Sequence, residues 1–325
     1  MRQQEAIRDD YFPNFDVIRL YLALVVVVAH AWWMISPSNA WSGSVMAVPA
    51  FLAVSGFLVL KSYSESGSLI VFAKKRALRI LPALLGSMIL CLCLLGWSAT
   101  ANALVTWLTG GIIEPAGITN APLWSLAWEE LAYLSLAVLW WLGAYKKPIF
   151  IWILLLTAMC ISWKVTRIPL SPFFQILSFL APAFFTGNLA YIYRARLLRM
   201  GSGWPWVLFA IVVLWKEVPL PSYVWAAAPP VVQAFSMVWA GMAGASIVRL
   251  KFPDISYGLY IYHWPILMYL AGSPSEKSII EFSIIYGASL ITTCVASWYL
   301  IERPAMKIKN RLRLSAKGQN KLAAH

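Results

Sequence analysis

Charged side chains are scarce in this sequence. Asp, Glu, Lys and Arg make up 12% of its 325 residues, hydrophobic residues make up 61%, and the mean hydropathy is +0.71. So few charges cannot cover the surface of a water-soluble globule. The composition therefore excludes an ordinary soluble protein and predicts an integral membrane protein.

Histidine and cysteine are also rare, with three and four residues. The cysteines all lie in apolar stretches without a CxxC pair, and the histidine spacing forms no ligand cluster. We therefore expect neither a disulfide framework nor a metal site. Internal repeats and long polar stretches are lacking too, so we predict one transmembrane domain at residues 1–310 and a basic cytoplasmic tail at 311–325.

Ten apolar stretches predict an all-α, polytopic fold with about ten transmembrane helices. The fifth and the seventh are shorter than the roughly 17 residues that a span usually needs. Between the third and the fourth, the weakly apolar piece from Asn102 to Ile113 is too short to span, and we expect it to be re-entrant or interfacial. The ten stretches are 16–35, 45–61, 78–97, 122–143, 149–163, 174–193, 204–215, 225–248, 255–271 and 279–301.

The basic residues are distributed as in a membrane protein. With the N terminus placed inside, only Lys164, Arg167, Lys216 and Lys277 of the 26 Lys and Arg residues fall in outer loops. This asymmetry follows the positive-inside rule and predicts that both termini are cytoplasmic. The net charge of +13 therefore implies no nucleic-acid partner, and the tail is expected to lie near anionic lipid.

The first apolar stretch carries both an arginine and a histidine. His30 follows Arg19 by eleven residues, which places both side chains on one helix face, about 16 Å apart. Ionisable groups at membrane depth are costly and suggest a function, and histidine titrates near neutral pH. We therefore interpret His30 as a candidate general base.

The fourth stretch places a carboxylate at a comparable depth. If this helix enters from outside near Pro122, Glu129 lies roughly 10 Å in, and His30 lies about 20 Å from the inner end of its own helix. The two side chains can then meet, and the carboxylate would orient the imidazole and raise its basicity. The neighbouring Glu130 points in another direction, so at most one of the two should face His30.

Six short runs, in order along the chain, resemble the motifs of one family. They are Arg19 with ten residues before His30, Phe-Leu-Ala-Val-Ser-Gly-Phe at 51–57, Lys-Arg-Ala-Leu-Arg-Ile-Leu-Pro at 75–82, Leu-Trp-Ser-Leu-Ala-Trp-Glu-Glu at 123–130 with Tyr133, Ser-Tyr-Gly-Leu-Tyr-Ile-Tyr-His-Trp-Pro at 256–265, and Ile-Glu-Arg-Pro at 301–304. The family is the acyltransferase-3 family of bacterial membrane acyltransferases, whose members modify cell-surface carbohydrates. The resemblance covers nearly the whole chain.

The resemblance implies a multi-pass enzyme of the bacterial inner membrane. Its donor would be an acyl-CoA, most simply acetyl-CoA, taken from the cytoplasmic side, and its acceptor a sugar hydroxyl on a lipid-linked or polymeric carbohydrate. Among the residues, the resemblance favours Glu129 over Glu130. It also implies substrate binding by Trp124, Ser125 and Tyr133.

Arg76 and Arg79 lie three residues apart at the inner end of the third stretch, on one helix face. Guanidinium groups suit phosphate oxygens. Together with Arg19, at a similar depth, they are expected to bind the nucleotide end of the coenzyme, and His263 is placed along the same donor channel. The alternative for Arg76 and Arg79 is ordinary positive-inside anchoring.

Structural alternatives remain open for the other residues. His30 and His263 can each be a buried ring that bonds a neighbouring helix, and Arg19 can simply pair with Asp16. A serine such as Ser125 more often bonds backbone than acts as a nucleophile.

Alternatives also remain for the function as a whole. His30 can carry the acyl group itself for a short time, as an acyl-histidine. A transporter or flippase can use Arg19, His30 and Glu129 as a buried polar path, although the absence of an inverted repeat argues against it. A non-catalytic partner in polysaccharide assembly is a third possibility.

Overall fold

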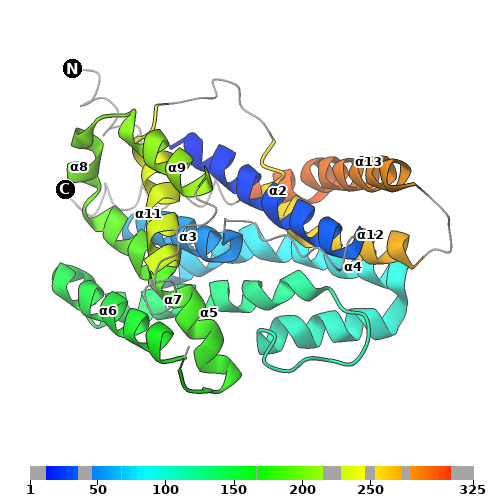
Figure 1. Ribbon diagram of the computed structural model, residues 1–325, viewed down its shortest axis with the longest axis horizontal. Helices are drawn as coiled ribbons and strands as arrows, with labels where there is room; N and C mark the ends of the chain where they lie inside the picture. Colours follow the sequence, from blue (N-terminus) through cyan, green and yellow to red (C-terminus); the bar gives the residue numbers. More distant parts are fainter. Residues whose placement is uncertain are drawn as a thin grey trace.

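The computed structural model describes residues 12–35, 46–66, 68–165, 167–214, 228–245, 253–272 and 278–308. Within these residues all regular secondary structure is helical, which confirms the predicted all-α fold (Figure 1). Each of the ten apolar stretches coincides with one helix. The ten are α2 (Asn14–Ile35), α3 (Ala47–Ser64), α4 (Leu69–Thr109), α5 (Trp124–Trp141), α6 (Pro148–Val165), α7 (Pro172–Ile192), α9 (Trp204–Leu214), α11 (Ala228–Ala243), α12 (Ser256–Ala271) and α13 (Ile279–Ser297).

Six of the described helices are long and apolar enough to cross a membrane, counting the run Ile279–Ile308 as one. A seventh is obtained if α9 and the short helical segment Arg194–Met200, bent by 91°, form one span. The fifth stretch, as α6, is therefore long enough to span the membrane. The seventh stretch can span it only together with the segment Arg194–Met200. The ten-span count stays a prediction. Both chain ends, with the predicted tail 311–325, lie outside the described residues.

The helices α3 and α7 form the centre of the bundle. In each, 61% of the most apolar window is buried, against 17–28% in the other candidate spans. Their backbones approach closely at glycines, because a Cβ at Gly187 would lie 2.0 Å from the carbonyl oxygen of Ala53, and one at Gly56 would lie 2.5 Å from that of Phe184. Small residues at such contacts are typical of helix pairs in membranes.

The third stretch differs from the prediction at both ends. Its helix α4 begins at Leu69 and continues to Thr109, but it is broken at Gly96, whose φ of +84° and ψ of −177° favour glycine. Figure 1 shows the chain turning within α4, at this break, and the second part of α4, residues 97–109, returning beside α5. Trp128 of α5 donates a hydrogen bond from Nε1 to the carbonyl oxygen of Gly110 at 2.9 Å. The piece expected to be re-entrant or interfacial is therefore a helix folded back onto the bundle.

The helix α12 packs against α2, α4 and α13 (Figure 1). Two contacts along the same face of α2 fix this arrangement. Near its start Arg19 pairs with Asp254, just before α12, and near its end His30 bonds His263 within α12. The predicted common face of Arg19 and His30 is thus the face that packs on α12, and the two helices run in the same direction.

Candidate active site

A cavity of about 110 Å³ lies among α2, α3, α4, α5, α7 and α12. Six residues that the sequence predicts for the site line it, namely Arg19, Arg76, Arg79, Ser125, Glu129 and Tyr133. The rest of its lining was not predicted for the site and includes Phe51, Ser55, Tyr257 and Tyr260. The fold thus gathers side chains from distant stretches around one internal space.

One end of this cavity is cationic and is organised by Asp254. Oδ2 of Asp254 accepts from Arg79 Nη2 at 2.8 Å and lies 3.2 Å from Arg19 Nη2. Arg19 also pairs with Asp16, so the predicted structural alternative for Arg19 is present as well. Burial alone would raise the pKa of the Asp254 carboxyl, but Arg19 and Arg79 together hold that pKa well below its usual range. Asp254 is therefore ionised and holds two arginines at the cavity.

Two buried arginine N–H groups at this end have no acceptor among the described residues, namely Arg76 Nε and Arg79 Nη1. The Arg76 guanidinium carbon lies 5.9 Å from the Phe72 ring centroid and 5.7 Å from that of Tyr133. Leaving a buried donor unpaired costs about 1–3 kcal/mol. This end of the cavity therefore suits an anionic ligand that would accept from both groups.

Glu129 lines the same cavity, but its hydrogen-bond partners are not the predicted His30. Ser55 Oγ donates to Glu129 Oε1 at 2.6 Å, and the hydroxyl of Tyr133, one helical turn further along α5, donates to the same oxygen. The adjacent Glu130 is absent from the cavity lining. Oε1 of Glu129 is thus held by two hydroxyl groups, and no described residue forms a hydrogen bond to Oε2.

Two aromatic rings meet in the lining of the cavity. The rings of Phe51 and Tyr260 meet edge to face at 5.6 Å, and both line the cavity. The Tyr260 hydroxyl lies 2.6 Å from Ser125 Oγ, which also donates to the carbonyl oxygen of Pro122 at 3.1 Å. Ser125 thus has the backbone hydrogen bond expected of a structural serine. His263 lies one turn beyond Tyr260, with 6.3 Å between the ring centroids.

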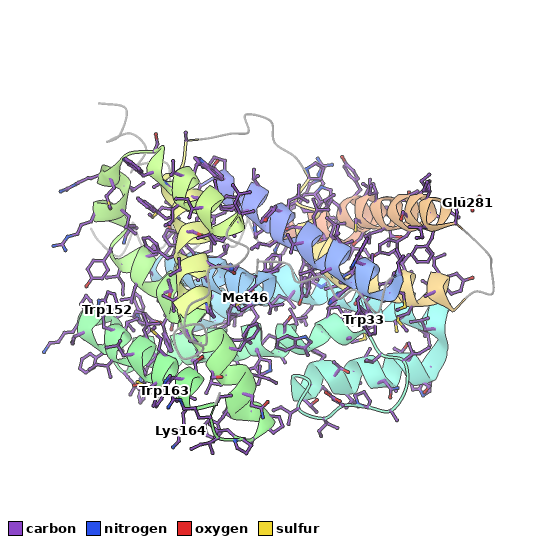
Figure 2. All side chains as sticks on the ribbon, in the orientation of Figure 1. Trp33, Met46, Trp152, Trp163, Lys164 and Glu281 are labelled. Carbon is purple, nitrogen blue, oxygen red and sulfur yellow. The ribbon has the colours of Figure 1, made fainter. Side chains whose placement is uncertain are left out.

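The predicted contact between His30 and Glu129 is wrong in this structure. His30 Nδ1 lies 2.8 Å from His263 Nε2, and the bonds of Glu129 go to Ser55 and Tyr133. The physical reason is the packing of α2 directly on α12, which brings His263 to His30. The half-buried ring of His30 also meets Trp264 edge to face at 4.9 Å. Figure 2 labels Trp33 near this end of α2.

Neither histidine lines the cavity, and Trp124 does not line it either. His263 is fully buried and bonds His30 on the neighbouring helix α2, which is the contact expected of a structural histidine. The Cβ of Trp124 instead lies close to Gly111, at the turn after α4. The catalytic role of His30, the place of His263 along the donor channel and substrate binding by Trp124 stay predictions.

Asp254, Ser55 and Tyr260 are three of the residues at the site to which the sequence assigned no role. Tyr260 lies within the run at 256–265, and Asp254 lies two residues before it, so proximity to the motif was the available signal. Across the described ranges, no group of His, Cys, Asp or Glu could hold a metal ion.

Fold and cavity together define a polytopic helical membrane protein with an internal site of mixed charge. A family model described as an acyltransferase domain matches residues 12–302, and the chain therefore belongs to the acyltransferase-3 family. This membership confirms the resemblance seen in the six runs and makes the protein an acyltransferase.

Two relatives are similar over most of their length. Nodulation protein 10 of Rhizobium leguminosarum bv. viciae is 27% identical over 354 residues, covering 92% of this chain and 94% of the relative. The O-acetyl transferase of Shigella phage Sf6 is 25% identical over 322 residues, covering 89% and 94%. No solved structure matches the chain.

Proposed function

We propose that this protein is an O-acyltransferase of the bacterial inner membrane that acylates cell-surface carbohydrate. The donor is a cytoplasmic acyl-CoA, and the acyl group is acetyl or another short chain. The name of the phage relative, an O-acetyl transferase, supports both the acetyl group and a hydroxyl acceptor. The carbohydrate acceptor follows from the family resemblance.

The observation that carries the donor assignment is the pair of unpaired arginine N–H groups at the cavity. A coenzyme A molecule brings phosphate oxygens, which are the acceptors that Arg76 and Arg79 need. The cavity volume of about 110 Å³ suits an acyl group and part of the pantetheine arm rather than a nucleotide. The nucleotide would therefore bind at the mouth, with its thioester directed inward.

In the reaction, His30 removes the proton of the acceptor hydroxyl through its ring nitrogen. The hydroxyl oxygen attacks the thioester carbonyl carbon, the carbon–sulfur bond breaks, and the imidazolium returns its proton to the coenzyme A thiolate. An acyl-histidine route would show as labelled enzyme when the acceptor is left out. Glu129 is assigned to the substrate, because its second oxygen can accept a hydrogen bond from a substrate N–H or O–H.

A movement of side chains is part of this proposal. Tyr260 lines the cavity and packs on Phe51, and its ring lies 6.3 Å from that of His263, the partner of His30, whereas His30 itself does not line the cavity. The thioester can reach His30 when this contact opens. Such a gate would also keep water from the thioester until both substrates are bound.

The function is tested by mass spectrometry of the surface polysaccharide from a strain in which the gene is deleted. We expect the deletion to remove an acyl mass increment from the sugar, and the wild-type gene to restore it. Val28→Ala is a matched control on α2, because its side chain is 43% exposed and faces away from the core. An unchanged polysaccharide mass would contradict the proposed function.

A further inference from the structure

The two histidine rings form a pair whose geometry fixes where the protons lie. His30 Nδ1 and His263 Nε2 are 2.8 Å apart, with 13° between the ring planes. The second nitrogen of His263, Nδ1, lies 3.0 Å from the carbonyl oxygen of Leu259. His263 is fully buried, and its whole ring is therefore held between two partners.

The carbonyl oxygen determines the tautomer of His263. A carbonyl only accepts hydrogen bonds, so Nδ1 of His263 must carry the hydrogen. No carboxylate among the described residues bonds either ring, and a buried unpaired cation would be costly, so both rings are neutral. In a neutral ring with hydrogen on Nδ1, Nε2 is an acceptor.

The same reasoning then fixes the tautomer of His30. Because His263 Nε2 accepts, His30 Nδ1 must be the donor and must carry the hydrogen. His30 Nε2 is then unprotonated, and no described residue forms a hydrogen bond to it. This nitrogen is the one that can take a proton from an alcohol.

The position of His263 is fixed by its helix. Pro265 lacks an N–H group, so the carbonyl oxygen of Ile261 loses its usual helical donor. The side chain of Asn120 supplies the missing hydrogen bond, with 3.1 Å between Nδ2 and that oxygen. The turn of α12 that carries His263 is thus tied to the segment before α5, which limits movement of the ring.

We propose that His263 is a positioning residue, which fixes His30 as the Nδ1–H tautomer and leaves Nε2 free to act as the base. The proposal rests on the proposed function, in which His30 is the base. When His30 takes the acceptor proton, its positive charge is stabilised through the hydrogen bond from Nδ1 to His263 Nε2. His263 therefore has the orienting role that the sequence analysis gave to Glu129.

The tautomer can be measured without any substrate. The chain has three histidines, so full-length protein labelled with ¹⁵N-histidine in lipid nanodiscs gives a simple spectrum, and His325→Ala removes the terminal residue from it. We expect His30 to show a protonated Nδ1 and an unprotonated Nε2. His263→Gln should keep this tautomer, because its amide oxygen accepts, whereas His263→Leu should shift His30 toward the mixture of a free imidazole.

A kinetic measurement completes the test, with acetyl-CoA and polysaccharide extracted from the deletion strain as substrates. We expect His263→Leu to lower kcat by about 10- to 100-fold, the range seen when the partner that orients a metal-bound histidine is lost, with little change in KM for acetyl-CoA. His263→Gln should restore most of kcat. Tyr262→Phe is the control, because it removes other buried hydrogen bonds of α12, to Ser297 Oγ at 2.8 Å and to the carbonyl oxygen of Ala83 at 3.2 Å, without touching the histidine pair.

Either of two results would overturn the proposal. One is an Nε2–H tautomer of His30 in the wild-type protein, which needs no variant to fold. The other is an unchanged tautomer or an unchanged kcat in His263→Leu. A wild-type protein with the expected tautomer but no transferase activity would contradict the proposed function alone.

Discussion

Ser55 Oγ donates a hydrogen bond to Glu129 Oε1 at 2.6 Å, which ties the centre of α3 to the start of α5 across the cavity. Tyr133 donates to the same oxygen. The carboxylate therefore has a fixed orientation before any substrate binds. In the structure Glu129 is therefore held in place by Ser55 and Tyr133, and it does not contact His30.

The first prediction concerns that carboxylate. We expect Glu129→Gln to lower acyl transfer by about tenfold or more, because a neutral amide accepts weaker hydrogen bonds than a carboxylate. Transfer is measured as release of free coenzyme A that depends on the acceptor. Glu130→Gln is the matched control on the same helix, since Glu130 does not line the cavity. Equal losses in the two variants would contradict the assignment.

The second prediction concerns the donor site. We expect Arg76→Ala to weaken binding of coenzyme A about 10-fold or more, because hydrogen bonds to charged groups contribute about 1.5–3 kcal/mol each. Calorimetric titration of the purified protein with coenzyme A measures this directly. Lys74→Ala removes an exposed positive charge from the same part of α4 and should leave affinity nearly unchanged. If Arg76→Ala binds like wild type, the donor assignment fails.

The third prediction uses the depressed pKa of Asp254. A carboxyl whose pKa is lower in the folded state stabilises the fold above its unfolded pKa of about 3.9 and loses this effect as the pH falls through the folded value. We therefore expect Asp254→Asn to lower the thermal unfolding midpoint at pH 7, by roughly 2–4 °C for each kcal/mol lost.

The pH dependence supplies the check on this third prediction. The difference in midpoint between Asp254→Asn and wild type should shrink as the pH is lowered below about 4. Scanning fluorimetry across this range measures it. A difference that stays constant with pH would show that the charge of Asp254 is not the cause.

The fourth prediction concerns the central helix pair. A Cβ at Gly187 would lie 2.0 Å from a backbone oxygen of α3, so Gly187→Ala must push the helices apart. We expect a loss of about 1–3 kcal/mol, the usual cost of overpacking, seen as a lower unfolding midpoint. Gly287→Ala on α13 is the control, because a Cβ there meets no atom within 4 Å. A midpoint unchanged by Gly187→Ala would contradict the close contact.

Much of the fold could be predicted because each helix of a membrane protein is one continuous apolar stretch of the sequence. Ten apolar stretches gave ten helices, and the spacing of Arg19 and His30 correctly predicted one shared face, since helical periodicity is local. The break at Gly96 was missed because a lone glycine within an apolar run does not reveal its backbone conformation. Six cavity residues were also predicted, from their motifs and depth.

The partners across helices could not be predicted in the same way. Helix lengths placed Glu129 and His30 at one depth, but in the structure Ser125, one turn before Glu129, meets Tyr260, and Tyr133, one turn after it, meets Arg76. Glu129 therefore lies nearer the arginines than His30 does, and the packing of α2 on α12, which a single sequence does not reveal, brings His263 to His30. Asp254 was missed for a related reason, because its role depends on two arginines from other helices.

The central claim is that the imidazole of His30 performs the proton transfer in acyl transfer to a sugar hydroxyl. The most direct measurement incubates full-length protein in nanodiscs with acetyl-CoA labelled in the acetyl group and polysaccharide from the deletion strain. Wild type and Val28→Ala should release coenzyme A only when the acceptor is present and should label the polysaccharide, whereas His30→Ala should do neither. Acceptor-dependent release at the wild-type rate in His30→Ala would contradict the account.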